Sequence, residues 1–414
     1  MKTSQVFLLL TLLSCALLSV HSQVVTTGVP FLLIAPSTEA NGMGGIMGSG
    51  TPTSSSSMMS NPAQLGMLSR DYTFSSDFYR HKTNWLPSFR LSDLWLNSYS
   101  AMYGVSFEDM LPLNPSIGFG FSRVYLNLGE FVRTDDRGNE IGRFKGYEYV
   151  NNYSLGVSID IGVQAAFGFT HKQILSHLSD FGVGQERGSG EANVTATDIG
   201  VTVKAPLYHL LTEENSTAPI FPFVDLSGAY AVNNLGDKIY YVDEAQNDPL
   251  PRTARIGWTA EAGLDITYRN AKFNFFRVSV AREAEDLLVG RDTSSWWYNG
   301  LTDDMDVYRS MVKSENYGNV SIRRGFSLSV FETFTYRQGS YAWDGNLTYQ
   351  TNGTSISTKG LFKAIGNSLS DEHGFNLTKY LLEHFEIRFS DSKYTGHDIV
   401  GSTSFKNIVI ALHQ

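Results

Sequence analysis

Cysteine and long apolar runs are scarce in this sequence. The only cysteine among its 414 residues is Cys15, which lies in the N-terminal segment 1–22. Lys2, the apolar run 6–20 and the small residue Ser22 together predict a secretory signal peptide that is cleaved before Gln23. The mature chain would then contain no cysteine, which excludes disulfides, thiol nucleophiles and thiolate metal sites. No other segment reaches about 18 consecutive apolar residues, so we expect no transmembrane helix after processing.

Positive charge and catalytic motifs are also scarce. Lysine and arginine number 32 against 41 acidic residues, and no basic run exceeds a few residues, so nucleic acid is not expected as a partner. No G-x-S-x-G, H-E-x-x-H or P-loop motif occurs, and we expect neither enzyme activity nor a cofactor. Asp303, Asp304 and Asp306 gather three carboxylates, but the glycine and closing glutamate of an EF-type calcium loop are missing. We therefore interpret this cluster as a solvated helix start in an outer loop and expect no metal.

What the sequence does contain is a strict alternation of apolar residues with small or polar residues. Over residues 153–170, apolar side chains occupy every odd position, while serine, glycine and other small or polar residues hold nearly all the even ones. Successive side chains of a β-strand point to opposite faces, so this pattern predicts one apolar and one polar face. Strands of soluble proteins have about 5–6 residues, whereas a tilted strand that crosses a bilayer needs about 9–11. The run is therefore either one long membrane strand or two strands that meet at a short turn.

Other segments repeat the pattern, which argues against chance. Residues 256–269 alternate cleanly, 198–204 and 384–389 do so over shorter stretches, and 326–336 agree except at Phe331 and Glu332. A soluble β-sandwich also alternates, but the run length and the charged residues on the polar face favour a polar lumen with a lipid-facing exterior. About 350 residues at about 25 per strand and connection allow about 14 strands. We predict an all-β protein, a transmembrane antiparallel β-barrel with an N-terminal hatch.

The hatch prediction rests on a segment unlike the rest. Residues 37–63 are rich in glycine, serine and methionine and do not alternate. A flexible linker is one interpretation. The preceding apolar residues 30–34 would be a poor choice for an exposed linker, so we favour a plug in the barrel mouth. The expected organisation is a signal peptide at 1–22, a hatch at 23–66 and a barrel at 67–414. The candidate ligand and hatch residues are Met43, Gly44, Met47, Met58, Met59, Asn61 and Pro62.

Several motifs carry a resemblance to a known family. Pro30–Ile34, Gly42–Gly45 and Asn61–Ala63 look like the start of PorV-type proteins, which belong to the outer-membrane barrels similar to the fatty-acid transporter FadL. The central block and a late hairpin extend the resemblance over most of the mature chain: Asn234–Ile239, Asp248–Arg252, Ile256-Gly257, and Arg324–Phe326 through Tyr336–Gly339. The resemblance implies a 14-stranded barrel with an N-terminal hatch, located in the outer membrane.

Two functions follow from this resemblance, and both are non-enzymatic. PorV-type members engage secreted cargo proteins in type IX secretion, whereas FadL-like members pass hydrophobic small molecules across the outer membrane. We expect the cargo role, with transport as the alternative and an adhesive sandwich without a pore as a third possibility. Aromatic residues are favoured anchors in protein interfaces, although they also line membrane interfaces. The candidate partner-binding residues are Trp296, Trp297 and Tyr298.

Overall fold

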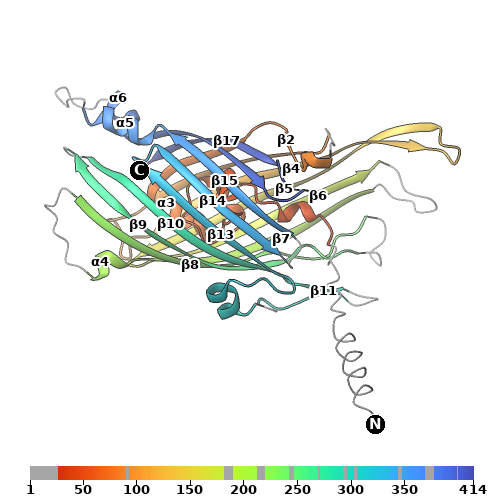
Figure 1. Cartoon of the computed structure of the whole chain (residues 1–414), viewed down its shortest axis with the longest axis horizontal. Helices are drawn as coiled ribbons and strands as arrows, with labels where there is room; N and C mark the ends of the chain where they lie inside the picture. The colour runs from red at the N-terminus through yellow and green to blue at the C-terminus, as the bar shows by residue number, and fades with distance from the viewer. Residues whose placement is uncertain are drawn as a thin grey trace, which may run out of the picture.

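Antiparallel strands close into a barrel in the computed structural model of this chain, because β1 pairs with β17 on one side and with β3 on the other. The structure describes residues 27–89, 93–180, 190–211, 220–241, 247–268, 271–291, 296–302, 305–343, 347–368, 377–398 and 400–414. The predicted all-β barrel with 14 strands is confirmed (Figure 1). The wall strands are β1 (Tyr72–Tyr79), β3 (Trp95–Ser106), β4 (Ser116–Thr134), β5 (Glu140–Asp160), β6 (Gln164–Ser179), β7 (Gly190–Pro206), β8 (Ile220–Gly236), β9 (Thr253–Tyr268), β10 (Ala271–Leu287), β13 (Val320–Val330), β14 (Phe334–Trp343), β15 (Leu347–Ser357), β16 (Phe385–Thr395) and β17 (Ser404–His413).

The smaller elements lie at the rims and inside. We call the rim that holds Tyr72 and His413 the C-terminal end, and the opposite rim, with the described parts of loops 237–252 and 288–319, the loop end. Outside the lumen lie β2 (Thr83–Asn84), η3 (Pro87–Phe89), α4 (Leu207–Leu211), β11 (Val289–Arg291), β12 (Trp296–Tyr298), η5 (Arg309–Lys313), α5 (Lys359–Gly366) and α6 (Leu377–His384). Before β1 come η1 (Pro30–Leu33), α2 (Thr38–Gly42), η2 (Ser55–Met59) and α3 (Ala63–Asp71). In the part of the chain that is described, no helix combines the length and apolarity needed to cross a membrane.

The long alternating run is two strands rather than one. β5 ends at Asp160 and β6 begins at Gln164, so a tight turn separates them at 161–163, where Gly162 has a positive φ of 90°. The break in alternation near 331 has a similar cause. Phe331 and Glu332 both adopt left-handed conformations, with φ of 54° and 52°, and form the turn between β13 and β14. Both irregularities therefore mark turns at the C-terminal end.

The two faces of the wall differ as the alternation predicts. Outward side chains are large and apolar, as in Phe119 (57% exposed), Phe167 (52%) and Val203 (47%). Their inward neighbours are small or polar and buried, as in Ser122 and Thr170, both 0% exposed. On the outside near the loop end, aromatic rings stack from strand to strand: Trp95 on Tyr125 at 5.3 Å, Tyr125 on Tyr147 at 5.8 Å and Tyr147 on His177 at 4.9 Å between ring centroids.

A row of glycines makes room for the N-terminal segment inside the barrel. Gly104, Gly118, Gly156, Gly168 and Gly200 are successive cross-strand partners from β3 to β7. A Cβ atom at any of them would lie within 3.0 Å of the segment 61–72, which contains α3. Only glycine permits so close an approach of two backbones. The row is thus a shallow groove in the inner wall, and α3 packs along it.

We expect Gly168→Val to displace the start of α3. The new side chain would overlap the carbonyl group of Pro62, and overpacking of this kind costs about 1–3 kcal/mol. The purified variant should unfold at lower denaturant concentration and should be cleaved by protease within residues 27–71. Gly142→Val is the matched control, because nothing lies within 4 Å of a Cβ at Gly142. Equal protease resistance of the two variants would contradict the packing described for α3.

Candidate functional site: the hatch, the wall break and the cavity between them

The N-terminal segment 27–71, which we call the hatch, is held in the lumen by buried charges of the wall. Glu283 of β10 is 0% exposed, and its Oε2 accepts hydrogen bonds from the backbone N–H groups of Gly48 (2.8 Å) and Ser49 (3.0 Å). The Ser49 hydroxyl donates to the same oxygen at 3.2 Å, and Arg255 donates to Oε1 at 3.4 Å. One carboxylate thus satisfies two buried backbone donors that have no secondary-structure partner.

A second charged contact holds α2 against β14 to β17. The Glu39 carboxylate accepts hydrogen bonds from Ser390 of β16 (3.0 Å) and Asn407 of β17 (3.3 Å). Burial alone would raise the pKa of Glu39, but the nearby guanidinium groups of Arg388 and Arg337 outweigh burial and hold this pKa below its ordinary value. Glu39 is therefore an anion that bridges the hatch to three wall strands.

The sequence-predicted hatch residues all lie in the lumen, and most of them contact the wall or each other. Gly44 (φ 76°) donates its N–H to Thr351 at 2.8 Å, and a Cβ there would strike the backbone of Ser340. Asn61 donates to the carbonyl of Gly48 (2.9 Å) and to the hydroxyl of Thr202 (3.0 Å), so it ties two parts of the hatch to β7. The rest pack within the hatch or against wall glycines: Met43, Met47, Met58, Met59 and Pro62. The helix α3 runs on to Asp71, past the expected boundary between 66 and 67.

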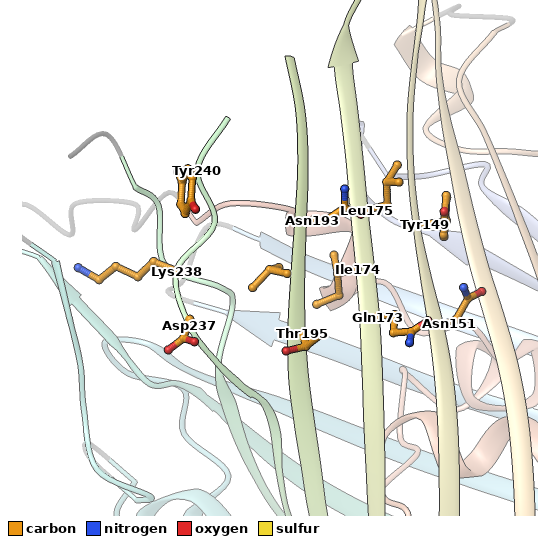
Figure 2. Close-up of a pocket in the computed structure, with 11 residues that line it drawn as sticks. Tyr149, Asn151, Gln173, Ile174, Leu175, Asn193, Thr195, Asp237, Lys238 and Tyr240 are labelled. Atoms are coloured by element: carbon orange, nitrogen blue, oxygen red, sulfur yellow. The ribbon is translucent and has the colours of Figure 1, made fainter. Parts of the chain in front are cut away.

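The wall is incomplete between β7 and β8 at the loop end. The last pair of these strands is Ala196 with Gly236, after a register shift near Asn234, which adopts a left-handed φ of 60°. Residues 190–195 of β7 pair with β6 and have no partner in β8, which is described over its whole length. The chain instead turns away as segment 237–240, and a depression of about 520 Å³ lies beside it. Figure 2 shows Asp237, Lys238 and Tyr240 across this depression from Asn193 and Thr195 of β7.

The same loop that borders the wall break also holds the start of the hatch. Ile239 and Asp248 form a β-bridge within loop 237–252, and the N–H of Gly28 donates to the carbonyl of Pro249 at 2.9 Å. Ile239 is 1% exposed and packs against Gly28. A displacement of this loop would therefore act on the wall break and the hatch entrance together.

Between η1 and the wall lies a cavity of about 30 Å³. Its apolar side is formed by Phe31, Leu32 and Ile34 of the hatch together with Val150 of β5. Its polar side includes Asn152, Lys172 and Asn233. Val150 is the cross-strand partner of Ile174, which lines the outer depression, so neighbouring wall residues line the cavity and the depression.

The candidate partner-binding residues lie beside this region and have unequal roles. The Trp296 carbonyl accepts a hydrogen bond from Lys238 at 3.3 Å, and the Tyr298 hydroxyl accepts one from the N–H of Leu250 at 2.8 Å. Both residues thereby support loop 237–252. Trp297 differs, because it is 45% exposed and its indole packs on Gly290 of β11. Of the carboxylates considered for calcium, Asp303 and Asp304 lie outside the described residues.

Sequence reasoning missed the apolar lining of the loop end and the polar groups of the cavity. Inward positions of β4 to β6 change from Ser116, Ser122 and Ser158 toward the C-terminal end to Val124, Val150 and Ile174 toward the loop end. This change was visible as a loss of small residues in the inward phase of each strand. Asn152, Lys172 and Asn233 had no such signal, because their proximity depends on the pairing of strands far apart in the sequence.

We expect Glu283→Gln to loosen the hatch. The neutral amide would weaken the hydrogen bonds with Gly48 and Ser49 and would leave the Arg255 charge less compensated, a loss of about 1–3 kcal/mol. Denaturant unfolding of the detergent-solubilised protein measures this loss. Glu140→Gln is the control, since that carboxylate lies at the surface and pairs with Arg143. A Glu283 variant as stable as the control would refute the role assigned to this carboxylate.

No protein-family profile matches this sequence, and no curated protein matches it either. Among solved structures, the chain is similar to the Ralstonia pickettii toluene transporter TbuX, with 12% identity, a TM-score of 0.41 and coverage of 92% of this chain and 98% of that one. It is also similar to the Pseudomonas putida toluene transporter TodX (10%, 0.38, 91% and 96%) and to a Pseudomonas aeruginosa FadL homologue (9%, 0.34, 91% and 97%).

Proposed function

We propose that this chain is a non-enzymatic outer-membrane barrel through which a small, largely apolar molecule passes under the control of the hatch. The observation that carries the proposal is the cavity between η1 and the wall, next to the break between β7 and β8. Ligand sites combine a concave apolar surface with placed polar groups, and this cavity joins apolar residues, those of η1 and β5 among them, with an equal number of polar residues. The PorV-like cargo role expected from the sequence becomes the second candidate.

The outer surface supports a membrane location. Apolar side chains such as Phe119, Phe167 and Phe389 point outward, with 52–57% of each exposed. Exposed apolar surface on this scale is unfavourable in water, whereas a lipid environment accommodates it. The stacked aromatic rings from Trp95 to His177 lie at the loop-end side of this surface, where a membrane interface favours such rings.

The proposed route leads from the depression through the wall break to the cavity. Along it, apolar residues follow one another: Ile174 at the depression, Val150 at the cavity wall, and Phe31 on η1. The cavity of about 30 Å³ is too small for a solute, because one water alone needs about 10–15 Å³. Passage therefore requires η1 to move, and loop 237–252 links that movement to the wall break.

A disulfide that fixes the hatch entrance should block passage. A Cβ at Gly28 would lie 3.2 Å from Cβ of Asp248, close to the separation of about 3.5–4.5 Å found in disulfides, but the Ile239 side chain, 2.5 Å from that Cβ, must shift to make room. The pair Gly28→Cys and Asp248→Cys, once oxidised, should reduce uptake of a radiolabelled alkylbenzene into proteoliposomes at least tenfold, and a reductant should restore uptake. The absence of other cysteines after Cys15 makes the pairing unambiguous.

Each single cysteine variant is the control, since it carries the substitution without the cross-link. Uptake that is equal in the oxidised and reduced double variant would exclude movement of the hatch entrance from the transport step. Uptake equal to that of protein-free liposomes in every sample would remove the transport proposal itself.

The second candidate, a cargo-engaging barrel in protein secretion, is favoured by surfaces at the loop end. Trp297 is 45% exposed on the β11–β12 hairpin. In addition, β4 and β5 continue as a projecting two-stranded hairpin past the last pairs with their neighbours, Asn127 with Trp95 and Tyr147 with His177 (Figure 1). Phe131 and Phe144 stack at 5.3 Å on this hairpin. Exposed aromatic residues are frequent anchors for protein partners.

If this candidate is right, Trp297→Ala should reduce capture of exported proteins at least tenfold in pull-downs from native membranes. An anchoring aromatic side chain in an interface contributes about 2 kcal/mol or more. Tyr208→Ala serves as the control, because Tyr208 is also an exposed aromatic residue (36%) but lies on α4 at the C-terminal end. Equal capture by both variants would remove Trp297 from the proposal.

A further inference from the structure

We propose that the cavity between η1 and the wall recognises the neutral hydroxyl group of an otherwise apolar molecule, such as a long-chain alcohol or an alkylphenol. This inference rests on the proposed transport function and narrows its substrate class. The observation that carries it is a combination of balanced charges with an unpartnered buried acceptor at the cavity.

The charged groups around the cavity are already compensated. Lys172 forms an ion pair with Asp198 at 2.8 Å, and Asp198 is 0% exposed. Arg255 contacts the carboxylates of both Glu283 and Glu285, and Glu285 in turn pairs with Arg323 at 2.8 Å. Two guanidinium groups thus face two carboxylates. A carboxylate or ammonium ligand would bring an uncompensated charge into a buried site, which is strongly unfavourable.

The uncharged polar atoms of the cavity would be satisfied by a ligand group that both donates and accepts hydrogen bonds. Asn233 is 5% exposed and donates its amide N–H to the carbonyl of Ser60 at 3.1 Å, which fixes the orientation of the amide. Its Oδ1 is buried and, like Asn152 Oδ1 on the same cavity, has no hydrogen-bond partner among the described residues. A buried acceptor without a partner costs free energy that a donor from a ligand would recover.

Lys172 provides the complementary donor. Its ammonium group has three N–H donors, one of which donates to Asn234 Oδ1 at 2.7 Å, while the charge forms an ion pair with Asp198 at 2.8 Å. An N–H group that is not used for Asn234 can donate to a ligand oxygen. A hydroxyl group accepts from Lys172 and donates to Asn233, whereas a carboxylate would place its lone pairs against Asn233 Oδ1. An alkane satisfies neither group.

The apolar body of the ligand would replace Phe31. This side chain is 2% exposed and, with Leu32 and Ile34, covers the polar groups of the cavity. The cavity of about 30 Å³ has room for no more than about two water molecules while η1 is in place. When η1 moves outward, the space of the Phe31 ring becomes available next to Val150. The hydroxyl group then occupies the polar side of the cavity, and the hydrocarbon part contacts the apolar wall of the loop end.

Binding of three probes of equal chain length tests this inference: radiolabelled 1-decanol, decanoate and decane, measured on the full-length protein in nanodiscs after subtraction of protein-free nanodiscs. We expect saturable binding of 1-decanol at least tenfold tighter than that of the other two probes. Asn233→Leu should weaken 1-decanol binding about tenfold and leave decane unchanged, as expected for one buried hydrogen bond. Asn97→Leu, on the outer face of β3, is the matched control.

A second variant covers the case in which Asn233→Leu displaces the hatch through loss of its contact with Ser60. Phe31→Ala enlarges the cavity and leaves its polar groups intact, so 1-decanol and decane should both bind more tightly while their ratio stays the same. Equal binding of all three probes to the wild type, or tighter binding of decanoate, would overturn the hydroxyl preference and leave the transport function standing. Failure of every probe to bind and to enter proteoliposomes would overturn both.

Discussion

The structure depends on the need to satisfy buried backbone groups inside a closed barrel. A wall of fourteen strands encloses more space than its own side chains fill, and the hatch that occupies this space has little regular secondary structure. Its N–H and C=O groups must therefore find partners on the wall. Glu283 accepts from Gly48 and Ser49, Thr351 accepts from Gly44, and Arg388 donates to the carbonyl of Thr53. Polar side chains on the inner face of the strands provide these partners.

The same requirement explains why the lumen has two distinct halves. Where the hatch runs along the wall as backbone, the wall presents glycine, serine and charged residues, as at Gly168 and Ser116. Where η1 meets the wall through side chains, the wall presents Val124, Leu126 and Val150. The apolar half lies at the loop end, beside the break between β7 and β8. Side-chain contacts in the apolar half do not fix the backbone of the hatch, so the hatch is more easily displaced there. Backbone hydrogen bonds in the polar half anchor it.

Sequence patterns predicted the wall well and its interior poorly. Alternation over 153–170 identified the two faces of β5 and β6, because each strand carries its own periodic signal. Glu283 and Gly48 are 235 residues apart, and nothing local in either segment indicates their contact. The wall break could not be predicted either, since it depends on the left-handed conformation of Asn234 and on the register between β7 and β8. Glycines in the inward phase of consecutive strands were the one available signal for the hatch groove.

The distribution of contacts along the hatch also decides which part can move. Residues 39–61 are held by the carboxylates Glu39 and Glu283 and by the Asn61 amide, which are buried groups with several partners each. The entrance is tied to the loop-end backbone by the bond from Gly28 to Pro249 and otherwise rests on apolar packing. Local opening begins where stabilising contacts are fewest. In the proposed transport function, segment 28–34 is therefore the part of the hatch that would separate from the wall while α2 and α3 stay bound.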